Sequence, residues 1–326
     1  MTSLRSALVL LVVLSNCQVY VSVLKRGSFW GLFLCLCWVF STAVWAVDLC
    51  DLKVEGLKAG ALSSLGVERV EVAQVFDGDT VLLVDGRKVR VIGVNTPELG
   101  HHNRPIEPLA TLAQEKLTRL LLGAETRRRK TLPVSALLRV GGDLQDHYGR
   151  TLGHLFSSAG INVTSRLLVD GLGFHVAIPP NLWSTDCYFV AQQGARGAGV
   201  GVWRLPYYGA KLAAANNLSG GYQRINGKIE KLFKSKESIW IDLVGSVTIK
   251  LNRRDSKFQQ GKVLKRVLDA YENKGLGLLP AIEIQGWMVD RVRWGGKMAA
   301  KIQKGERNRW QFNLRHHYQW HFISAN

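Results

Sequence analysis

Alternating apolar and polar positions dominate the chain from Glu68 onward. Apolar side chains recur at every second position over residues 70–75, 80–84 and 89–94. Asp77-Gly78 and Asp85-Gly86 separate these runs, and such dipeptides are typical of tight turns. Because a period of two marks half-buried strands, the pattern predicts three consecutive strands joined by short turns.

The pattern then changes to a helical period. Glu107–Gly123 carries an apolar stripe that ends at a glycine, which predicts a helix. Strands are predicted over Pro133–Val140 and Arg150–Phe156, and helices over Asn162–Leu172 and Ser184–Trp203. Five strands around an inserted helix favour a small barrel of the oligonucleotide-binding (OB) type.

A second unit follows an Ala-, Asn- and Gly-rich stretch, Tyr207–Gly221, which is predicted to be a linker. The next elements are four strands, at Ile225–Lys231, Ser238–Val244, Val247–Arg253 and Ala281–Val292, and a helix at Lys262–Asn273. Thirteen alternating residues, Trp310–Phe322, predict one long final strand. The expected fold class is therefore mainly β (α+β), with two small five-stranded OB-like barrels in tandem.

The first 46 residues are too apolar for a soluble core. Two apolar runs, Ala7–Leu24 and Phe29–Ala46, flank Lys25-Arg26, as in a signal peptide, and export to the periplasm or the medium is expected. A helical hairpin or an uncleaved membrane anchor stays open, because each run is near the length that spans a bilayer. The expected organisation is a targeting segment (1–46), an arm (47–67), a first barrel (68–205), a linker (206–221) and a second barrel (222–326).

Positive charge is concentrated at the C-terminal end. The net charge is +18, and residues 220–326 hold 21 basic against 9 acidic side chains. This excess favours a polyanionic partner, nucleic acid or an anionic membrane, although a basic surface also serves solubility.

Cysteine usage supports export. Cys17, Cys35 and Cys37 lie in the targeting segment, so the exported chain would keep only Cys50 and Cys187. An even number of cysteines in an oxidising compartment predicts one disulfide between them.

Three short segments carry the candidate chemistry: 76–80 (Phe-Asp-Gly-Asp-Thr), 90–98 (Arg-Val-Ile-Gly-Val-Asn-Thr-Pro-Glu) and 146–150 (Asp-His-Tyr-Gly-Arg). Each alone would be an ordinary turn or strand end. Together, in order and spacing, they resemble the signature segments of the thermonuclease (staphylococcal-nuclease-like) family, over roughly Glu68–Trp203. The resemblance implies a nuclease acting on DNA, RNA or both.

Hydrolysis of a phosphodiester needs charge neutralisation and an activated water. Asp79 and Asn95 offer hard oxygen ligands, and the resemblance adds the main-chain carbonyl of Thr96, which implies one Ca²⁺ ion. Arg90 and Arg150 supply forked donors matched to phosphate oxygens. Glu98 resembles the family's candidate general base, which either accepts a proton or orients water.

Asn95 departs from the family, whose best-known members carry aspartate there. An amide oxygen still coordinates, but the lost charge predicts weaker Ca²⁺ binding. Some bacterial relatives resemble this chain in having Asn at this position, followed by a run like Arg104–Ala110.

The second barrel combines basic residues with tryptophans, a mix suited to tracking backbones and stacking bases. Its candidate nucleic-acid-binding residues are Lys228, Lys234, Lys236, Arg253, Arg254, Arg291 and Arg293. No stable protein partner is implied, and a membrane tether would run through residues 1–46. The alternative function is a non-catalytic protein that holds nucleic acid with tandem barrels.

Overall fold

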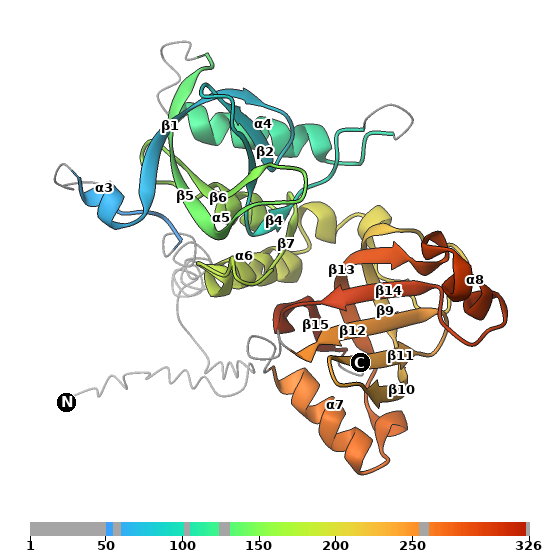
Figure 1. Ribbon diagram of the computed structural model, residues 1–326. Helices are drawn as coiled ribbons and strands as arrows, with labels where there is room; N and C mark the ends of the chain where they lie inside the picture. The colour runs from blue at the N-terminus through green and yellow to red at the C-terminus, as the bar shows by residue number, and fades with distance from the viewer. Residues whose placement is uncertain (1–49, 55–59, 101–104, 124–130, 254–260, 324–326) are drawn as a thin grey trace, which may run out of the picture. The chain divides into compact units, whose positions relative to one another are not determined.

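The structure, a computed structural model (Figure 1), describes residues 50–54, 60–100, 105–123, 131–253 and 261–323. Residues 46–326 form one compact unit. The predicted targeting segment lies outside the described residues. Among the helices that are described, none is both long and apolar enough to cross a membrane.

The first region is the predicted five-stranded barrel. Its strands pair in the closed order β1-β2-β3-β6-β5. They are β1 (Val67–Val75), β2 (Thr80–Leu83), β3 (Lys88–Val91), β5 (Val134–Gln145) and β6 (Thr151–Ser157). β1 closes the barrel because its first part pairs with β5 and its last part, after a bulge, pairs with β2.

Alternate residues of these strands fill the interior. Val72, Val81, Val89, Leu138 and Leu155 are all fully buried, as the period of two predicted. Burying each such side chain contributes about 1.5–3 kcal/mol. The opposite face of the same strands is left for charged residues.

Three helices follow in the predicted order: α4 (Ala110–Leu122), α5 (Val163–Val169) and α6 (Thr185–Ala198). A short helix before β1, α3 (Ala61–Ser64), was not predicted. α4 buries one stripe, Ala110, Ala113, Leu117 and Leu121, against the barrel. Asn162 caps α5 by accepting a hydrogen bond from the Ser165 backbone N–H at 3.0 Å. A small ladder joins β4 (Val94–Asn95) to β7 (Phe174–His175).

The predicted disulfide is present. Cys50 and Cys187 are bonded, with their Cα atoms 6.0 Å apart. The bond connects the arm before the barrel to α6 across 137 residues of sequence.

The second region is a half-barrel sheet rather than a closed five-stranded barrel. It has eight strands, and seven of them follow the order β10-β11-β12-β14-β13-β9-β8. They are β8 (Lys211–Leu212), β9 (Gly221–Gly227), β10 (Ile229–Lys234), β11 (Ser238–Leu243), β12 (Val247–Asn252), β13 (Ile282–Asp290) and β14 (Trp310–Leu314). The eighth, β15 (Trp320–Phe322), pairs with β13.

β10, at one end of this order, and β9, next to last at the other end, come from one stretch of chain. β9 pairs with β13 and β10 pairs with β11, yet only Lys228 separates β9 from β10. If β9 and β10 are counted as one interrupted strand, the strand order matches that of the first barrel. α7 (Lys262–Glu272) lies between the third and fourth strands, as predicted.

The prediction of one long strand over Trp310–Phe322 is wrong. β14 ends at Leu314, and a 3-10 helix, η6 (His317–Gln319), precedes β15. Local side chains satisfy the backbone there in place of a strand ladder. The Gln319 side-chain oxygen accepts from the N–H groups of Arg315 and His316, at 2.7 and 2.9 Å.

Further short elements complete the chain: η1 (Gly201–Trp203), η2 (Pro206–Tyr208), η4 (Leu276–Leu278), η5 (Arg291–Trp294) and α8 (Gly296–Gln303). Within the stretch expected to be a linker, η2 and β8 are ordered. The Tyr208 hydroxyl donates to the Pro108 carbonyl at 2.6 Å, and β8 pairs with β9.

Candidate active site

The Asp79 carboxylate is the centre of the candidate site. Asp79 immediately precedes β2 and is 4% exposed. Its Oδ2 forms an ion pair with Arg90 at 2.8 Å and accepts from the backbone N–H and the hydroxyl of Thr96 at 2.9 and 3.1 Å. Arg90 and Thr96, from separate elements, therefore both contact the Asp79 carboxylate.

Pairing of β2 with β3 brings the arginine to this place, because Thr80 lies opposite Arg90. The Arg90 guanidinium also donates to the side-chain oxygen of Asn95 at 3.3 Å and to the Val91 carbonyl at 3.1 Å. The β4–β7 ladder holds Asn95 in position. Asp79, Arg90, Asn95 and Thr96 thus form one hydrogen-bonded group.

Gly78 lets the Asp77–Asp79 turn approach Thr96. A Cβ atom at Gly78 would lie 2.7 Å from the Ala113 side chain and 2.8 Å from that of Thr96, so no larger residue fits. The Asp79 backbone N–H donates to Asp77 at 2.9 Å and closes the turn. Glycine is required here by close packing, not only by turn geometry.

Glu98 lies at the edge of the same group. Its backbone N–H donates to the Glu107 side chain at 3.0 Å, and its carbonyl accepts from the Glu107 N–H at 3.0 Å. These two bonds join the Thr96–Glu98 segment to the chain just before α4. Glu98 is also near enough to Asp77 to raise the pKa of that carboxyl.

Arg150 lies on the same face of the barrel as Arg90. β3 and β6 are parallel, with Arg90 opposite Leu152, so Arg150 sits about one strand spacing (~5 Å) across and two residues (~7 Å) along. The Arg150 side chain is held by Asp146 at 2.8 Å and lies over the exposed Tyr148 ring. Arg90 in β3 and Arg150, just before β6, are therefore candidates for contacting one phosphate.

Asp77 lies beside the candidate site, although Asp77-Gly78 was interpreted from the sequence only as a turn. Burial raises the pKa of Asp77 to about 7, and the Asp79 carboxylate adds to this effect, while Arg90 opposes it. The spacing of Asp77 and Asp79 on either side of a tightly packed glycine was the available signal.

The donor chemistry fits a hard cation. Asp79, the Asn95 amide oxygen and the expected Thr96 carbonyl are the oxygen ligands that Ca²⁺ prefers, and the Asp77 carboxyl lies nearby. Within the part of the chain that the structure describes, no three histidine, cysteine or acidic side chains gather closely enough to hold a metal alone. The amide and carbonyl are thus needed to complete a ligand set.

The candidate nucleic-acid-binding residues of the second region do not form one cluster. Lys234, Lys236 and Arg253 lie around the β10–β11 turn, where Lys234 pairs with Glu272 and Arg253 donates to the Ser235 carbonyl. Lys228 is exposed between β9 and β10, and Arg293 is exposed in η5. Arg254 lies outside the described residues.

Arg291 differs from these surface cations. It is 3% exposed and donates to the Asn308 carbonyl at 3.2 Å and to the Met298 sulfur at 3.3 Å. A buried guanidinium cannot track a backbone along a surface. It can contact only a ligand that enters the pocket beside it.

Comparison with known proteins agrees with this geometry. The family model described as "Staphylococcal nuclease homologue" matches residues 88–205. The thermonuclease of Staphylococcus hyicus is 28% identical over 149 residues, which are 45% of this chain and 82% of the relative. The thermonuclease of Staphylococcus intermedius is 31% identical over 140 residues, which are 40% of this chain and 74% of the relative. The chain therefore belongs to the thermonuclease family and carries its nuclease domain in the first barrel.

Proposed function

We propose that this protein is an exported, Ca²⁺-dependent nuclease that hydrolyses phosphodiester bonds of DNA, RNA or both by attack of water. The single observation that carries the proposal is the hydrogen-bonded group of Asp79, Arg90, Asn95 and Thr96, with Arg150 on the same face of the barrel. A protein that only binds nucleic acid has no physical need for that combination.

The residues have separate tasks. Arg90 and Arg150 donate to the phosphate oxygens and stabilise the charge that develops as water attacks phosphorus. Glu98 is positioned to orient that water or to take its proton. Ca²⁺ bound by Asp79, Asn95 and Thr96 would neutralise phosphate charge. Because Asp79 already holds Arg90, the ligand and the clamp are fixed relative to one another.

Export is supported by two features. The apolar segment 1–46 is typical of a signal peptide. The Cys50–Cys187 disulfide is a bond that persists in oxidising compartments and is rare in the cytosol. We therefore place the mature protein in the periplasm or the medium.

A digestion assay tests the function directly. The full chain is incubated with end-labelled single-stranded DNA, duplex DNA and RNA, with Ca²⁺ or with a chelator. Cleavage is expected with Ca²⁺ and not with the chelator. Glu98→Gln and Arg90→Gln are each expected to reduce the rate about 100-fold or more.

Arg87→Gln is the matched control. Arg87 lies on the same β2–β3 hairpin as Arg90 and also pairs with carboxylates, but its partners are Glu68 and Asp85, outside the site. Its rate should stay near that of the parent protein. Binding of nucleic acid without cleavage under every condition would establish the non-catalytic alternative instead.

A further inference from the structure

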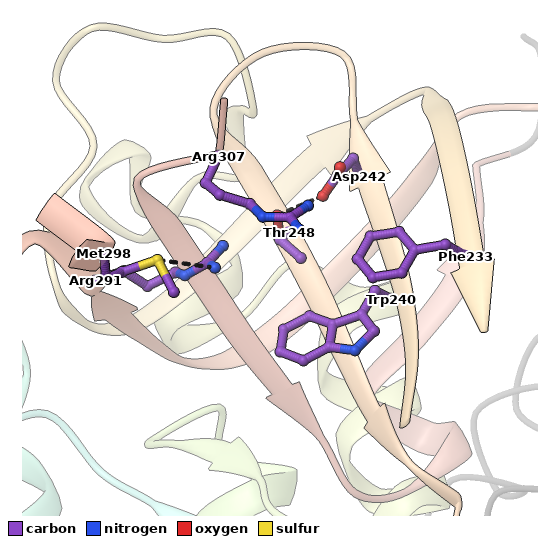
Figure 2. Close-up of a pocket in the computed structure, with 7 residues that line it drawn as sticks. All are labelled: Phe233, Trp240, Asp242, Thr248, Arg291, Met298 and Arg307. Carbon is purple, nitrogen blue, oxygen red and sulfur yellow. Dashed lines mark hydrogen bonds between the residues drawn. The ribbon is translucent and has the colours of Figure 1, made fainter. Parts of the chain in front are cut away.

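A pocket of about 260 Å³ opens in the C-terminal half-barrel, away from the candidate active site. Figure 2 shows the seven residues that line it: Phe233, Trp240, Asp242, Thr248, Arg291, Met298 and Arg307. The first four come from β10, β11 and β12, and the last three from η5, α8 and the segment after α8. The volume is near the lower limit for small-ligand sites, so it suits one planar ring system, not two.

The floor of the pocket is aromatic. Phe233 and Trp240 are direct cross-strand partners on β10 and β11. Their rings are nearly parallel, with an interplanar angle of 7° and centroids 5.9 Å apart. Figure 2 shows the two rings side by side. Both side chains are only half-buried, so a second planar group can lie against them.

The walls of the pocket are mainly positive. Of the lining residues, Arg307 lies over the Phe233 ring at 5.4 Å and Arg291 over Trp240 at 6.0 Å. Lys250 does not line the pocket but lies over the same Trp240 ring at 5.1 Å. The one acid that lines the pocket, Asp242, accepts a hydrogen bond from the Thr248 hydroxyl. Aromatic rings without these cations would suit a quaternary ammonium, but three positive side chains repel such a ligand. An anion with a planar group is favoured.

Arg291 gives the site a donor without a partner. The side chain is 3% exposed, and its Nε–H is buried without a hydrogen-bond acceptor, although both terminal nitrogens are bonded. Buried donors are nearly always paired, so an orphaned one indicates a missing acceptor. Burial, and next the charge of Arg307, lower the pKa of Arg291. A bound anion would accept a hydrogen bond from the Arg291 Nε–H and offset the repulsion between Arg291 and Arg307.

We propose that this pocket binds one unpaired nucleotide of a single-stranded nucleic acid. The base stacks on Trp240 and Phe233, and the phosphate is bound by Arg291 and Arg307. Asp242 lies where it can accept a hydrogen bond from an amino group of the base. The identity of the ligand rests on the proposed nuclease function, whereas the pocket's preference for a planar anion does not.

The test is a binding measurement on the full chain in chelator, so that no cleavage occurs. The probe is a fluorescein-labelled ten-residue oligothymidylate, titrated at two salt concentrations. Trp240→Leu is expected to weaken binding about tenfold or more, because stacking on one aromatic ring contributes that much per base. Arg307→Gln is expected to weaken it by a similar factor, because it removes a charge-assisted hydrogen bond to the phosphate. Arg307 is exposed, so its variant should fold even if Trp240→Leu does not.

Two controls are matched to these variants. Arg266 is another exposed arginine that lies over a phenylalanine ring, Phe322, but on α7, outside the pocket. Trp287 is a half-exposed tryptophan on β13, also outside it. Arg266→Gln and Trp287→Leu should leave affinity within about twofold. If they weaken binding as much as the pocket variants do, the whole basic surface binds and the pocket proposal is overturned.

Competition identifies the ligand. Adenosine monophosphate should displace the labelled strand from the parent protein and should bind Arg307→Gln about tenfold more weakly. Equal displacement by inorganic phosphate would overturn the stacking role. Mononucleotide binding that depends on the pocket, with strand binding unaffected by the variants, would overturn the assignment to a strand.

Failure of this inference is distinguishable from failure of the nuclease proposal. The pocket variants should keep the parent's maximal cleavage rate at saturating substrate while raising the substrate concentration for half-maximal rate. A parent protein that never cleaves, but binds the oligonucleotide through Trp240 and Arg307, would sink the nuclease proposal and support the pocket.

Discussion

The two β regions of this chain share a strand order but not a chemistry. In the first barrel, β1 runs unbroken over nine residues and pairs with both β2 and β5. In the second region, Lys228 interrupts the equivalent stretch between β9 and β10, and the sheet stays a half-barrel. Each region also has a parallel pair at the corresponding place in this order, β3–β6 in the first and β12–β14 in the second.

The difference lies in what each hairpin carries. At the start of β2, Thr80 pairs with Arg90, and Asp79 is adjacent. At the start of β11, Ser238 pairs with Asn252, so the second region has no equivalent ion pair among its described residues. The outer sheet face there carries Phe233 and Trp240 instead. A shared topology therefore supports catalysis in one copy and, as we propose, base binding in the other.

The largest expected effect concerns the disulfide, which only the first region has. Replacing Cys50 and Cys187 together by serine releases a 137-residue loop, for which the chain-entropy relation gives up to about 5 kcal/mol of lost stability. Guanidinium unfolding of the double variant should show a loss of about 3–5 kcal/mol. An unchanged midpoint would mean that the disulfide contributes nothing to stability.

Acid should weaken the first region next. Burial lowers the pKa of His154 and of His175 to about 3, from an unfolded value near 6.5. Both are neutral in the folded protein, so the unfolded chain binds more protons between pH 6.5 and pH 3, and stability falls as pH falls through that window. Each of the two histidines should lower the free energy of unfolding by about 2 kcal/mol between pH 7 and pH 5.

The measurement is the urea midpoint at pH 7 and pH 5. His154→Gln should remove about 2 kcal/mol of this pH dependence, whatever it does to absolute stability. In the parent, the His154 Nδ1 hydrogen-bonds the buried Tyr188 hydroxyl at 3.0 Å. An identical slope in the variant would show that His154 is not kept neutral by the fold.

A smaller effect is expected where the two regions meet. Glu283 on β13 accepts hydrogen bonds from Arg196 of α6 and from Arg224 of β9. The Glu283 side chain is only 6% exposed. Glu283→Gln leaves both arginines without their anion and should cost about 3 kcal/mol. Glu230→Gln, which removes an exposed glutamate paired with Lys231, should cost less than about 0.5 kcal/mol. Thermal unfolding compares them.

Because of these contacts, deleting the second region would also disturb the first. Removing residues 220–326 would leave Arg196 unpaired and uncover Phe174, which stacks on Tyr222. Weaker substrate binding by a truncated chain would therefore not isolate the role of the second region. Point variants on the intact protein are the cleaner test.

The smallest effect concerns Asn95, the proposed metal ligand. Asn95→Asp adds a charged ligand beside Asp79, so Ca²⁺ affinity measured by calorimetry should rise about tenfold, or about 1.4 kcal/mol. Unchanged affinity would argue that residue 95 is not a ligand.

Local patterns were enough to predict most of the elements. The period of two located β1, β2 and β3, and the apolar stripe located α4, because these signals depend on neighbours along the chain. The pattern failed over Trp310–Phe322, where the Gln319 side chain replaces ladder bonds, and no periodicity reports such a contact. The interruption at Lys228 is likewise invisible in the alternation.

By itself, the sequence determined which residue types could perform phosphodiester chemistry and the order of the elements that carry them. The tertiary structure decided which residues meet: it brought Arg90 to Asp79, added Asp77 to the site, and buried Arg291 beside Trp240 instead of leaving it on the surface. The reason is physical. Periodicity indicates which residues of one element face the core. A site depends on contacts between strands, and these are fixed by strand register and by closure of the sheet.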